Sequence, residues 1–255
     1  MTKKPEHFDF GKTTLQGLNQ EFLHVDPLKD AYVESIIEVP GIEKSIQLQR
    51  VALMVIDLQF LDAAPGIGVF ADAEKSGVPI EAQEYYFKRL DHVVLPNIGR
   101  LLNIFRDMKL EVVHTRIQSL TQDGRDRSAG HKRLGLHAPP GSKEAEFLPE
   151  VAPKGDEIII NKTASGVFNA TNAEFIFRNM GIDTLYVCGV YTNECVSTTV
   201  RDACDRGFHT TLITDSCATV TPDLHNATIA TIKDRYARVM TTDEVIREIK
   251  QVVAV

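Results

Sequence analysis

The chain has 255 residues, 43% of them hydrophobic, and a formal net charge of −7 at pH 7. This length and composition allow one substantial core, either as one large α/β domain or as one domain with an arm. The acidic excess argues against nucleic acid and anionic membrane surfaces as main partners. No apolar stretch is long enough to cross a bilayer and the first residues show no signal-peptide pattern, so no membrane partner is expected.

The four cysteines form no C-x-x-C pair and no cluster with histidines, so they predict neither a zinc knuckle nor a disulfide framework. A reduced, cytoplasmic protein is therefore expected. Cys188 lies in an apolar run and Cys204 in a helical pattern, and both are interpreted as structural. Cys217 follows a predicted strand and is expected nearer a cleft.

Residues 1–48 have mixed polarity and no sustained hydrophobic period. We interpret them as an N-terminal arm that wraps the domain or reaches a neighbouring subunit, with a disordered tail as the alternative. The domain itself is expected over residues 49–255.

From residue 51 onward, short apolar runs alternate with segments that carry apolar residues at helical spacing. The predicted strands are 51–56, 110–115, 157–160, 185–188, 208–214 and 237–240. The predicted helices are 81–108 (one helix, or a pair broken near Pro96), 172–180, a helix that begins near Cys195 and stops at Gly207, 223–235 and 242–252. Strands that are apolar throughout and alternate with helices specify a doubly wound, three-layer α/β/α fold with a parallel sheet.

Two long segments interrupt this alternation. Residues 60–80, with two prolines and three glycines, are predicted to form a loop with little structure. Residues 116–153 form a second, polar loop, and loops of such length are usually functional or disordered. Whether this second loop acts as a lid is left open.

Few polar residues follow the strands directly, and these are the informative ones, because ligands of an open parallel sheet bind beyond the carboxyl ends of its strands. They are Asp57, Arg116, Lys162, the turn 191–195, Asp215 and Cys217. The turn after the first strand contains no G-x-G-x-x-G, and no P-loop occurs in the chain. A dinucleotide is therefore not expected, and no cofactor is predicted.

Three of these residues could act together in one reaction: Asp57, Lys162 and Cys195. Cys195 falls near the first turn of a helix, where free N–H groups, the helix dipole and a lysine charge would lower the pKa of the thiol. Asp57 would take the thiol proton and return it to a leaving amine, and the turn before Cys195 offers backbone N–H groups for an oxyanion. Taken singly, each residue has a structural alternative: a buried core cysteine, a loop or capping aspartate, and a solvated lysine.

Three motifs in this order resemble the isochorismatase-like cysteine hydrolases: Val55–Gln59, Lys162 with Ser165–Thr171, and Gly189–Val196. The resemblance covers about residues 50–250. It implies a six-stranded parallel sheet, a homotetramer or homodimer, and a catalytic triad of Asp57, Lys162 and Cys195. It also implies backbone N–H groups of Tyr191 and Cys195 as oxyanion donors, and a cis Val190–Tyr191 peptide.

Two features narrow the expected activity. Nicotinamidases of this family carry an Asp-x-His metal site, but the corresponding stretch here reads His114-Thr115-Arg116-Ile117-Gln118, so no metal is expected and nicotinamide is disfavoured as substrate. The run from Cys195 to Thr199, with Arg201, is similar to the branch that cleaves ureides, biuret hydrolase among them.

Substrate-binding roles are predicted for Arg116 and Gln118, which would bind a carboxylate or a ureido carbonyl, and for Tyr191. Phe168 would line the pocket, with a place in the core as the alternative. His114 is expected to be a buried strand histidine and not a ligand.

The sequence thus predicts a cysteine-dependent amidohydrolase that cleaves a C–N bond of a small ureido or carboxamide compound through a thioester, releasing ammonia. The partner is a small-molecule substrate. The alternatives are an isochorismatase-type hydrolase of vinyl ethers, which the presence of Cys195 disfavours, and a non-catalytic ligand-binding member of the fold.

Overall fold

A computed structural model of the chain describes residues 41–253. Most of the predicted N-terminal arm, residues 1–40, therefore lies outside the described residues. The last part of the arm forms a short helix, α2 (Ile42–Gln47), whose buried residues Ile42 and Ile46 belong to the main core. This helix contacts the C-terminal helix α11 (Thr242–Val253), so residues 42–47 pack against the domain.

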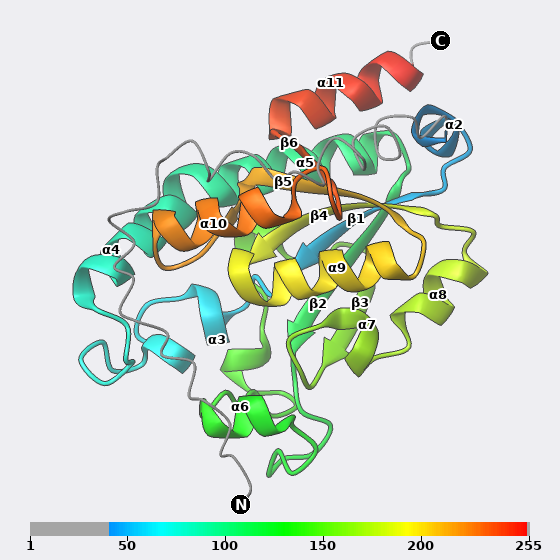
Figure 1. The fold of residues 1–255 in the computed structure, drawn as a ribbon. Helices are drawn as coiled ribbons and strands as arrows, with labels where there is room; N and C mark the ends of the chain where they lie inside the picture. The colour runs from blue at the N-terminus through cyan, green and yellow to red at the C-terminus, as the bar shows by residue number, and fades with distance from the viewer. Residues whose placement is uncertain (1–40, 254–255) are drawn as a thin grey trace, which may run out of the picture.

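The centre of the molecule is a sheet of six strands, all parallel, in the order β3-β2-β1-β4-β5-β6 (Figure 1). The strands are β1 (Val51–Ile56), β2 (Glu111–Ile117), β3 (Ile158–Lys162), β4 (Thr184–Val190), β5 (His209–Ala218) and β6 (Arg238–Met240). Every residue of β1 and β4 is buried, as their unbroken apolar sequences require for strands covered on both faces. The predicted six-stranded parallel sheet is confirmed.

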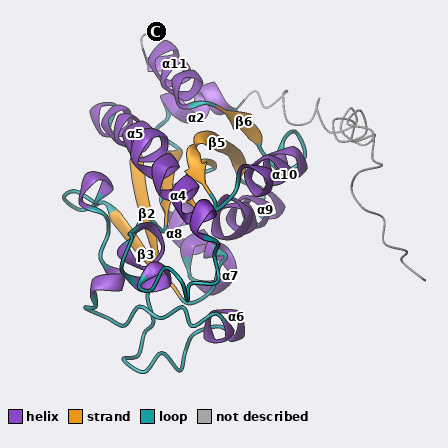
Figure 2. Ribbon diagram, turned by 90° about the vertical axis from the view of Figure 1, so that its left-hand side faces the viewer, coloured by secondary structure: helices purple, strands orange, loops and turns teal. Residues whose placement is uncertain are grey.

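Helices cover both faces of the sheet, which makes three layers (Figure 2). On one face lie α5 (Leu95–Asp107) and α11, which contact each other and β5. On the other face, α9 (Ser197–Asp205) contacts β5 and packs against α7 (Val167–Ala170) and α10 (Pro222–Ile232). Further helices are α3 (Phe60–Ala63), α4 (Ile80–Arg89), α6 (Ala129–Arg133) and α8 (Ala173–Asn179). None of the helices in residues 41–253 combines the length and the apolar character needed to cross a bilayer.

The segment predicted as one helix or a broken pair is a pair, α4 and α5, joined by a π-helical turn over Leu90–Val94. Pro96 is the second residue of α5, just after this π-helical turn, and its missing N–H interrupts the helical hydrogen-bond ladder there. The buried side chains of α5 face the sheet, as their helical spacing predicts.

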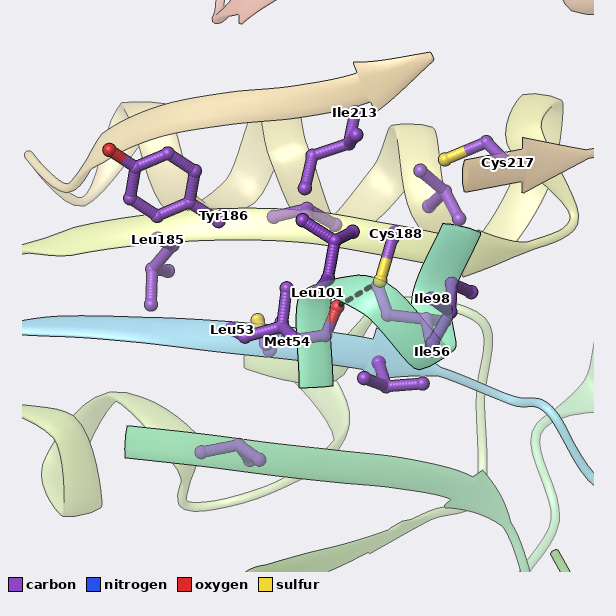
Figure 3. Packing of buried hydrophobic residues seen from close by; sticks show 14 of the residues in the cluster. Leu53, Met54, Ile56, Ile98, Leu101, Leu185, Tyr186, Cys188, Ile213 and Cys217 are labelled. Atoms are coloured by element: carbon purple, nitrogen blue, oxygen red, sulfur yellow. Dashed lines mark hydrogen bonds between the residues drawn. The ribbon is translucent and has the colours of Figure 1, made fainter. Parts of the chain in front are cut away.

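Residues of β1, β4, β5 and α5 pack into the core, among them Met54, Leu185 and Leu101 (Figure 3). Cys188 lies in this core with its thiol 3.5 Å from the carbonyl oxygen of Met54. Cys217, which was expected nearer a cleft, is also fully buried, because β5 continues to Ala218 and carries it between sheet and helices. All four cysteines are free thiols.

The two long segments are more structured than predicted, and both lie at the carboxyl ends of the strands. The first contains α3, and the second contains α6. They are tied together by an antiparallel bridge between Gln59 and Phe147 and by a hydrogen bond from the N–H of Leu148 to the carbonyl of Leu58 (3.0 Å). The segments thus form one layer over the strand ends.

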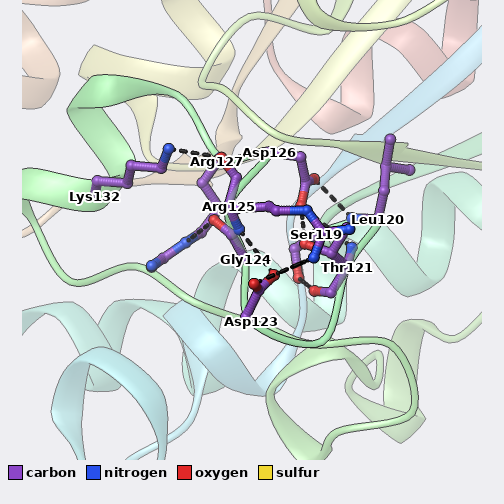
Figure 4. Close-up of polar contacts among 9 residues, drawn as sticks. All are labelled: Ser119, Leu120, Thr121, Asp123, Gly124, Arg125, Asp126, Arg127 and Lys132. Atoms are coloured by element: carbon purple, nitrogen blue, oxygen red, sulfur yellow. Dashed lines mark hydrogen bonds and ion pairs between the residues drawn. The ribbon is translucent and has the colours of Figure 1, made fainter.

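The second segment is braced by its own polar groups (Figure 4). The carboxylate of Asp126 accepts hydrogen bonds from the N–H of Leu120 (2.7 Å) and from the N–H and hydroxyl of Thr121 (3.2 and 2.6 Å). The ammonium group of Lys132 donates to the carbonyl of Arg125 (2.6 Å). These bonds give residues 119–132 a defined path at the carboxyl end of β2.

Candidate active site

Asp57 is the first residue after β1, and its backbone turns sharply there. Its φ of 54° lies in the left-handed region, which aspartate tolerates better than most residues. The N–H of Asp57 donates to the carbonyl of Thr115 (3.1 Å), and the Thr115 hydroxyl donates to Asp57 Oδ1 (3.0 Å). The neighbouring strand β2 therefore fixes both the backbone and one carboxylate oxygen of Asp57.

Lys162 is the last residue of β3 and is completely buried. Its Nζ lies 2.7 Å from Asp57 Oδ2, 3.3 Å from Cys195 Sγ and 3.0 Å from the carbonyl oxygen of Ala164. Lys162 forms an ion pair with Asp57 and donates hydrogen bonds to Cys195 and Ala164. The structure thus brings the three predicted triad residues together.

Cys195 lies in a π-helical turn, Thr192–Val196, that leads directly into α9. The carbonyl of Tyr191 accepts hydrogen bonds from the N–H groups of Glu194 (3.0 Å) and Val196 (3.2 Å), which closes this turn. The Val190–Tyr191 peptide is cis, as the family resemblance implied. Of the predicted oxyanion donors, the N–H of Cys195 belongs to this turn and the N–H of Tyr191 directly precedes it, and their role stays a prediction.

The electrostatics of the thiol differ from the expectation drawn from the sequence. Burial raises the pKa of Cys195 well above its ordinary value, and Lys162 lowers it only in part. Burial alone would lower the pKa of Lys162, but Asp57 and Cys195 raise it, so the lysine is a permanent cation. The unbound site therefore holds an ion pair beside a neutral thiol, because a thiolate would be a further charge in an enclosed space.

Gln59 connects the turn after β1 to its surroundings, and the sequence did not single it out for this. Its side-chain amide donates to the carbonyls of Ile117 (2.9 Å) and Glu144 (2.8 Å), and its oxygen accepts from the N–H of Ile117 (2.6 Å). The residue is fully buried. It therefore holds the end of β1, the end of β2 and the second long segment in register.

Asp62 is a second residue that the sequence did not assign to the site. It lies in α3, five residues after Asp57, and its side chain is buried beside the triad. Burial, and then the charge of Asp57, raise its pKa to about 8, while Lys162 acts in the opposite direction. A carboxyl group in a segment predicted to be loosely structured gave no signal that it would be enclosed.

The predicted substrate-binding residues have different surroundings in the structure. Arg116 lies within β2, next to Thr115, and adjacent strand residues face opposite sides of the sheet. Its guanidinium donates to Asn161 Oδ1 (2.7 Å) and to the carbonyl of Ala145 (2.9 Å). Arg116 thus braces a loop against β3, and these contacts do not include the triad.

Phe168 packs against Phe177 and Phe208, with ring centroids 5.9 and 5.5 Å away, which favours the core alternative for this residue.

Gln118 lies closer to the site: its N–H donates to the carbonyl of Lys162 (3.1 Å), and its buried Oε1 has no hydrogen-bond partner among the described residues. A buried acceptor without a partner is available to a ligand, so the prediction for Gln118 stays open.

A cleft adjoins the turn that carries Cys195. One cavity of about 240 Å³ is lined by Tyr191, Asn193 and Glu194 together with aliphatic residues. A neighbouring cavity of about 310 Å³ shares Val69 and Leu136 with it. Cys195 itself is 5% exposed and is adjacent in the chain to Glu194, which lines this cleft. A small molecule in this cleft would contact the turn that contains Cys195.

His114 is a buried strand residue, as predicted, and its Nε2 lies 3.1 Å from Glu157. Burial lowers its pKa to about 4 in spite of Glu157. Within residues 41–253, no cluster of three or more histidine, cysteine, aspartate or glutamate side chains is arranged to hold a metal ion.

Comparisons with known proteins identify the family. A family model described as the isochorismatase domain matches residues 77–244. The chain is 30% identical over 211 residues to YwoC, an uncharacterized isochorismatase family protein of Bacillus subtilis, with 81% of this chain and 97% of that protein covered. The chain therefore belongs to the isochorismatase family.

Two further matches describe the range of this family. The chain is 27% identical over 162 residues to an N-carbamoylsarcosine amidase from an Arthrobacter species, which covers 60% of each protein. The crystal structure of a cysteine hydrolase from Pseudomonas syringae pv. phaseolicola superposes with a TM-score of 0.67 at 24% identity, over 80% of this chain and 94% of that one. That structural likeness establishes the fold, and the family is one of hydrolases that includes amidases acting on C–N bonds.

Proposed function

We propose that this protein is a cysteine-dependent amidohydrolase that cleaves a C–N bond of a small ureido or carboxamide compound. The observation that carries the proposal is the position of Lys162, whose Nζ lies within 2.7 Å of Asp57 and 3.3 Å of Cys195. A buried thiol, a carboxylate and a shared cation are what acyl transfer from an amide requires. Similarity to an N-carbamoylsarcosine amidase supports a ureido substrate.

In the first half of the reaction, Sγ of Cys195 attacks the carbonyl carbon while Asp57 accepts the thiol proton. The negative charge that forms on the carbonyl oxygen would be met by the N–H groups of Tyr191 and Cys195. Asp57 then gives its proton to the leaving nitrogen, the C–N bond breaks, and ammonia leaves a thioester on Cys195. Lys162 stabilises the anionic sulfur and later the ionised Asp57.

In the second half, water attacks the thioester carbonyl and Asp57 accepts a proton from that water. The C–S bond breaks, and the proton returns from Asp57 to the thiolate of Cys195. The neutral thiol of the unbound protein fits this cycle, because the thiolate needs to form only as the proton moves to Asp57. The cycle consumes only the substrate and water and regenerates the three side chains.

The decisive experiment measures ammonia release from a panel of N-carbamoyl amino acids, substituted ureas, biuret and primary amides, with a vinyl ether as contrast. We expect turnover of one or more ureido or amide compounds, and none after Cys195→Ala. Cys204→Ala is the matched control, because this partly exposed cysteine lies in α9, outside the triad, and should leave the rate unchanged. Full activity of Cys195→Ala, or turnover of the vinyl ether alone, would contradict the proposal.

A further inference from the structure

Asp62 is buried beside the triad, yet part of its carboxyl group has no partner. It is the third residue of α3, and it is 2% exposed. Its Oδ1 makes no hydrogen bond among the described residues. Leaving a buried acceptor unsatisfied costs stability, on the order of 1–3 kcal/mol. A buried acceptor in this state is available to a ligand.

The backbone of Asp62 is fixed to the turn of the nucleophile. Its carbonyl oxygen accepts hydrogen bonds from the hydroxyls of Tyr86 (2.9 Å) and Tyr191 (3.0 Å). The two tyrosine rings pack with centroids 5.2 Å apart. Tyr191 directly precedes the π-helical turn that carries Cys195. Asp62 and the nucleophile are thus positioned against each other by buried contacts.

Charged and titratable groups from several elements influence the carboxyl group of Asp62. They are Asp57 after β1, Lys162 at the end of β3, Glu194 and Cys195 in the π-helical turn, Tyr191 before it and Tyr86 in α4. The helix α3 also contacts the turn Lys143–Ala145, which carries Lys143 and Glu144. The ammonium group of Lys162 lies next to Asp57, Cys195 and the carbonyl of Ala164. The raised pKa of Asp62, about 8, agrees with a carboxyl group that is neutral at pH 7.

We propose that Asp62 is a substrate-binding residue whose Oδ1 accepts a hydrogen bond from an N–H group next to the scissile carbonyl. The proposal rests on the amidohydrolase function proposed above and specifies its substrate: a ureide or an amide that keeps at least one N–H. Esters, vinyl ethers and fully N-substituted amides lack this donor. A site with a buried acceptor discriminates strongly against analogues that cannot pair with it.

A neutral carboxyl group suits this position better than a carboxylate. Before the reaction, Lys162 and Asp57 balance each other. When Asp57 takes the thiol proton, the charge of Lys162 is balanced instead by the oxyanion or the thiolate. A neutral Asp62 adds no charge to either state. An ionised Asp62 would place a second anion beside the developing one and slow the reaction.

The test compares Asp62→Asn with Asp62→Leu, using the ureido or amide compound that the parent protein turns over best. Asparagine keeps an acceptor oxygen without the charge, so it should hold kcat/KM at pH 7 within a few fold of the parent. Leucine removes the acceptor at similar volume and should lower kcat/KM about 10- to 100-fold, as expected for one lost hydrogen bond to a substrate. The exposed Glu74→Gln serves as control.

The pH profile gives a readout that a merely structural residue would not change. The kcat/KM of the parent should fall above about pH 8, where Asp62 ionises, and Asp62→Asn should remove that alkaline limb. Should Asp62→Leu fail to fold, the profile of the asparagine variant decides alone. An unchanged alkaline limb in Asp62→Asn, or a leucine variant within twofold of the parent, would overturn this inference while leaving the amidohydrolase proposal intact. A parent that turns over none of the panel would overturn both.

Discussion

Glu157 and Asp62 are both carboxyl groups largely withdrawn from water, and the protein surrounds them in opposite ways. Glu157, directly before β3, is 13% exposed. It receives hydrogen bonds from Arg106 at 2.6 and 2.9 Å and from the N–H of Lys154 at 2.9 Å, and it pairs with His114. Burial acts to raise the pKa of Glu157, and these partners overcome that effect and lower it.

Asp62 has the opposite arrangement. Its backbone is held firmly by two tyrosine hydroxyls, while Oδ1 of its side chain has no partner. A carboxylate whose oxygens are satisfied by protein groups acts as a clamp, here between α5 and the start of β3. A carboxyl group whose position is fixed, but whose oxygen has no hydrogen-bond partner in the protein, can accept a hydrogen bond from a ligand. Asp57 lies between these extremes, since it forms an ion pair with Lys162 and accepts a hydrogen bond from Thr115, and in the proposed reaction it exchanges a proton.

The largest effect on activity after loss of the nucleophile is expected from Asp57→Asn. The amide cannot accept the thiol proton, so kcat/KM should fall on the order of 10²–10⁴-fold, the usual contribution of general acid–base catalysis. The matched variant Glu157→Gln also neutralises a buried carboxylate, but one in the clamp. It should leave kcat unchanged in steady-state assays. Comparable losses in both variants would erase the distinction between clamp and site.

Breaking the two ion pairs should affect stability unequally. Lys162→Met leaves the fully buried Asp57 without its cation and should lower the free energy of unfolding by about 3–5 kcal/mol. Arg106→Met leaves Glu157 with His114, the N–H of Lys154 and some contact with water, so a smaller loss of about 1–3 kcal/mol is expected. Urea unfolding curves measure both. A larger loss in the arginine variant would contradict this ranking.

The pH dependence of stability separates Asp62 from the rest of the protein. A carboxyl group with a raised pKa in the folded state contributes stability that is full below its ordinary value of 3.8 and is lost as the pH rises through about 8. Asp62→Asn removes this dependence, so its stability relative to the parent should increase by about 1.4 kcal/mol per pH unit between these limits.

The buried histidines change the stability with pH in the opposite direction to Asp62. Their contribution cancels when the parent protein is compared with Asp62→Asn. Burial lowers the pKa of His114, His131 and His225 to about 4, so the stability that they contribute is present above pH 6.5 and lost as the pH falls through 4. Both proteins share this loss. A stability difference that stays flat between pH 4 and 8 would show that Asp62 is ionised in the folded protein.

The smallest effect, none at all, is expected from chelation. His114 occupies part of the stretch where nicotinamidases of this family bind a metal, but here it belongs to the Glu157 clamp. Dialysis against a chelator should leave kcat/KM unchanged. Activity that disappears and returns with zinc, iron or manganese would refute this expectation.

The sheet and the proximity of Asp57, Lys162 and Cys195 could be predicted because both depend on local patterns. Strands that are apolar throughout ended in Asp57, Lys162 and the turn before Cys195, and parallel strands bring such ends to one edge. Asp62 could not be predicted, because its burial depends on Tyr86 and Tyr191, 24 and 129 residues away in the chain. The raised pKa of Cys195 was missed for a similar reason, since desolvation requires the surrounding segments to be in place.

The strand that leads to Arg116 was predicted to end two residues too early. The predicted strand ended at Thr115, which left Arg116 free to follow it into the site. The actual strand continues to Ile117, so Arg116 takes the face opposite to Thr115. Boundaries of strands are poorly specified by hydrophobic pattern alone, because polar residues such as Thr115 and Arg116 extend β2 beyond its apolar run.

Gly189 allows a close approach of β4, which leads to Cys195, to β1, which leads to Asp57. It pairs with Ile56, the residue before Asp57, and a Cβ at this position would lie 2.1 Å from the carbonyl oxygen of Ile56. Its φ of 119° is also one that other residues rarely adopt. The backbone that leads to Asp57 and the backbone that leads to Cys195 are therefore in direct contact at Ile56 and Gly189. The strands can approach this closely because residue 189 has no side chain. We expect any larger residue at this position to push Asp57 and Cys195 apart.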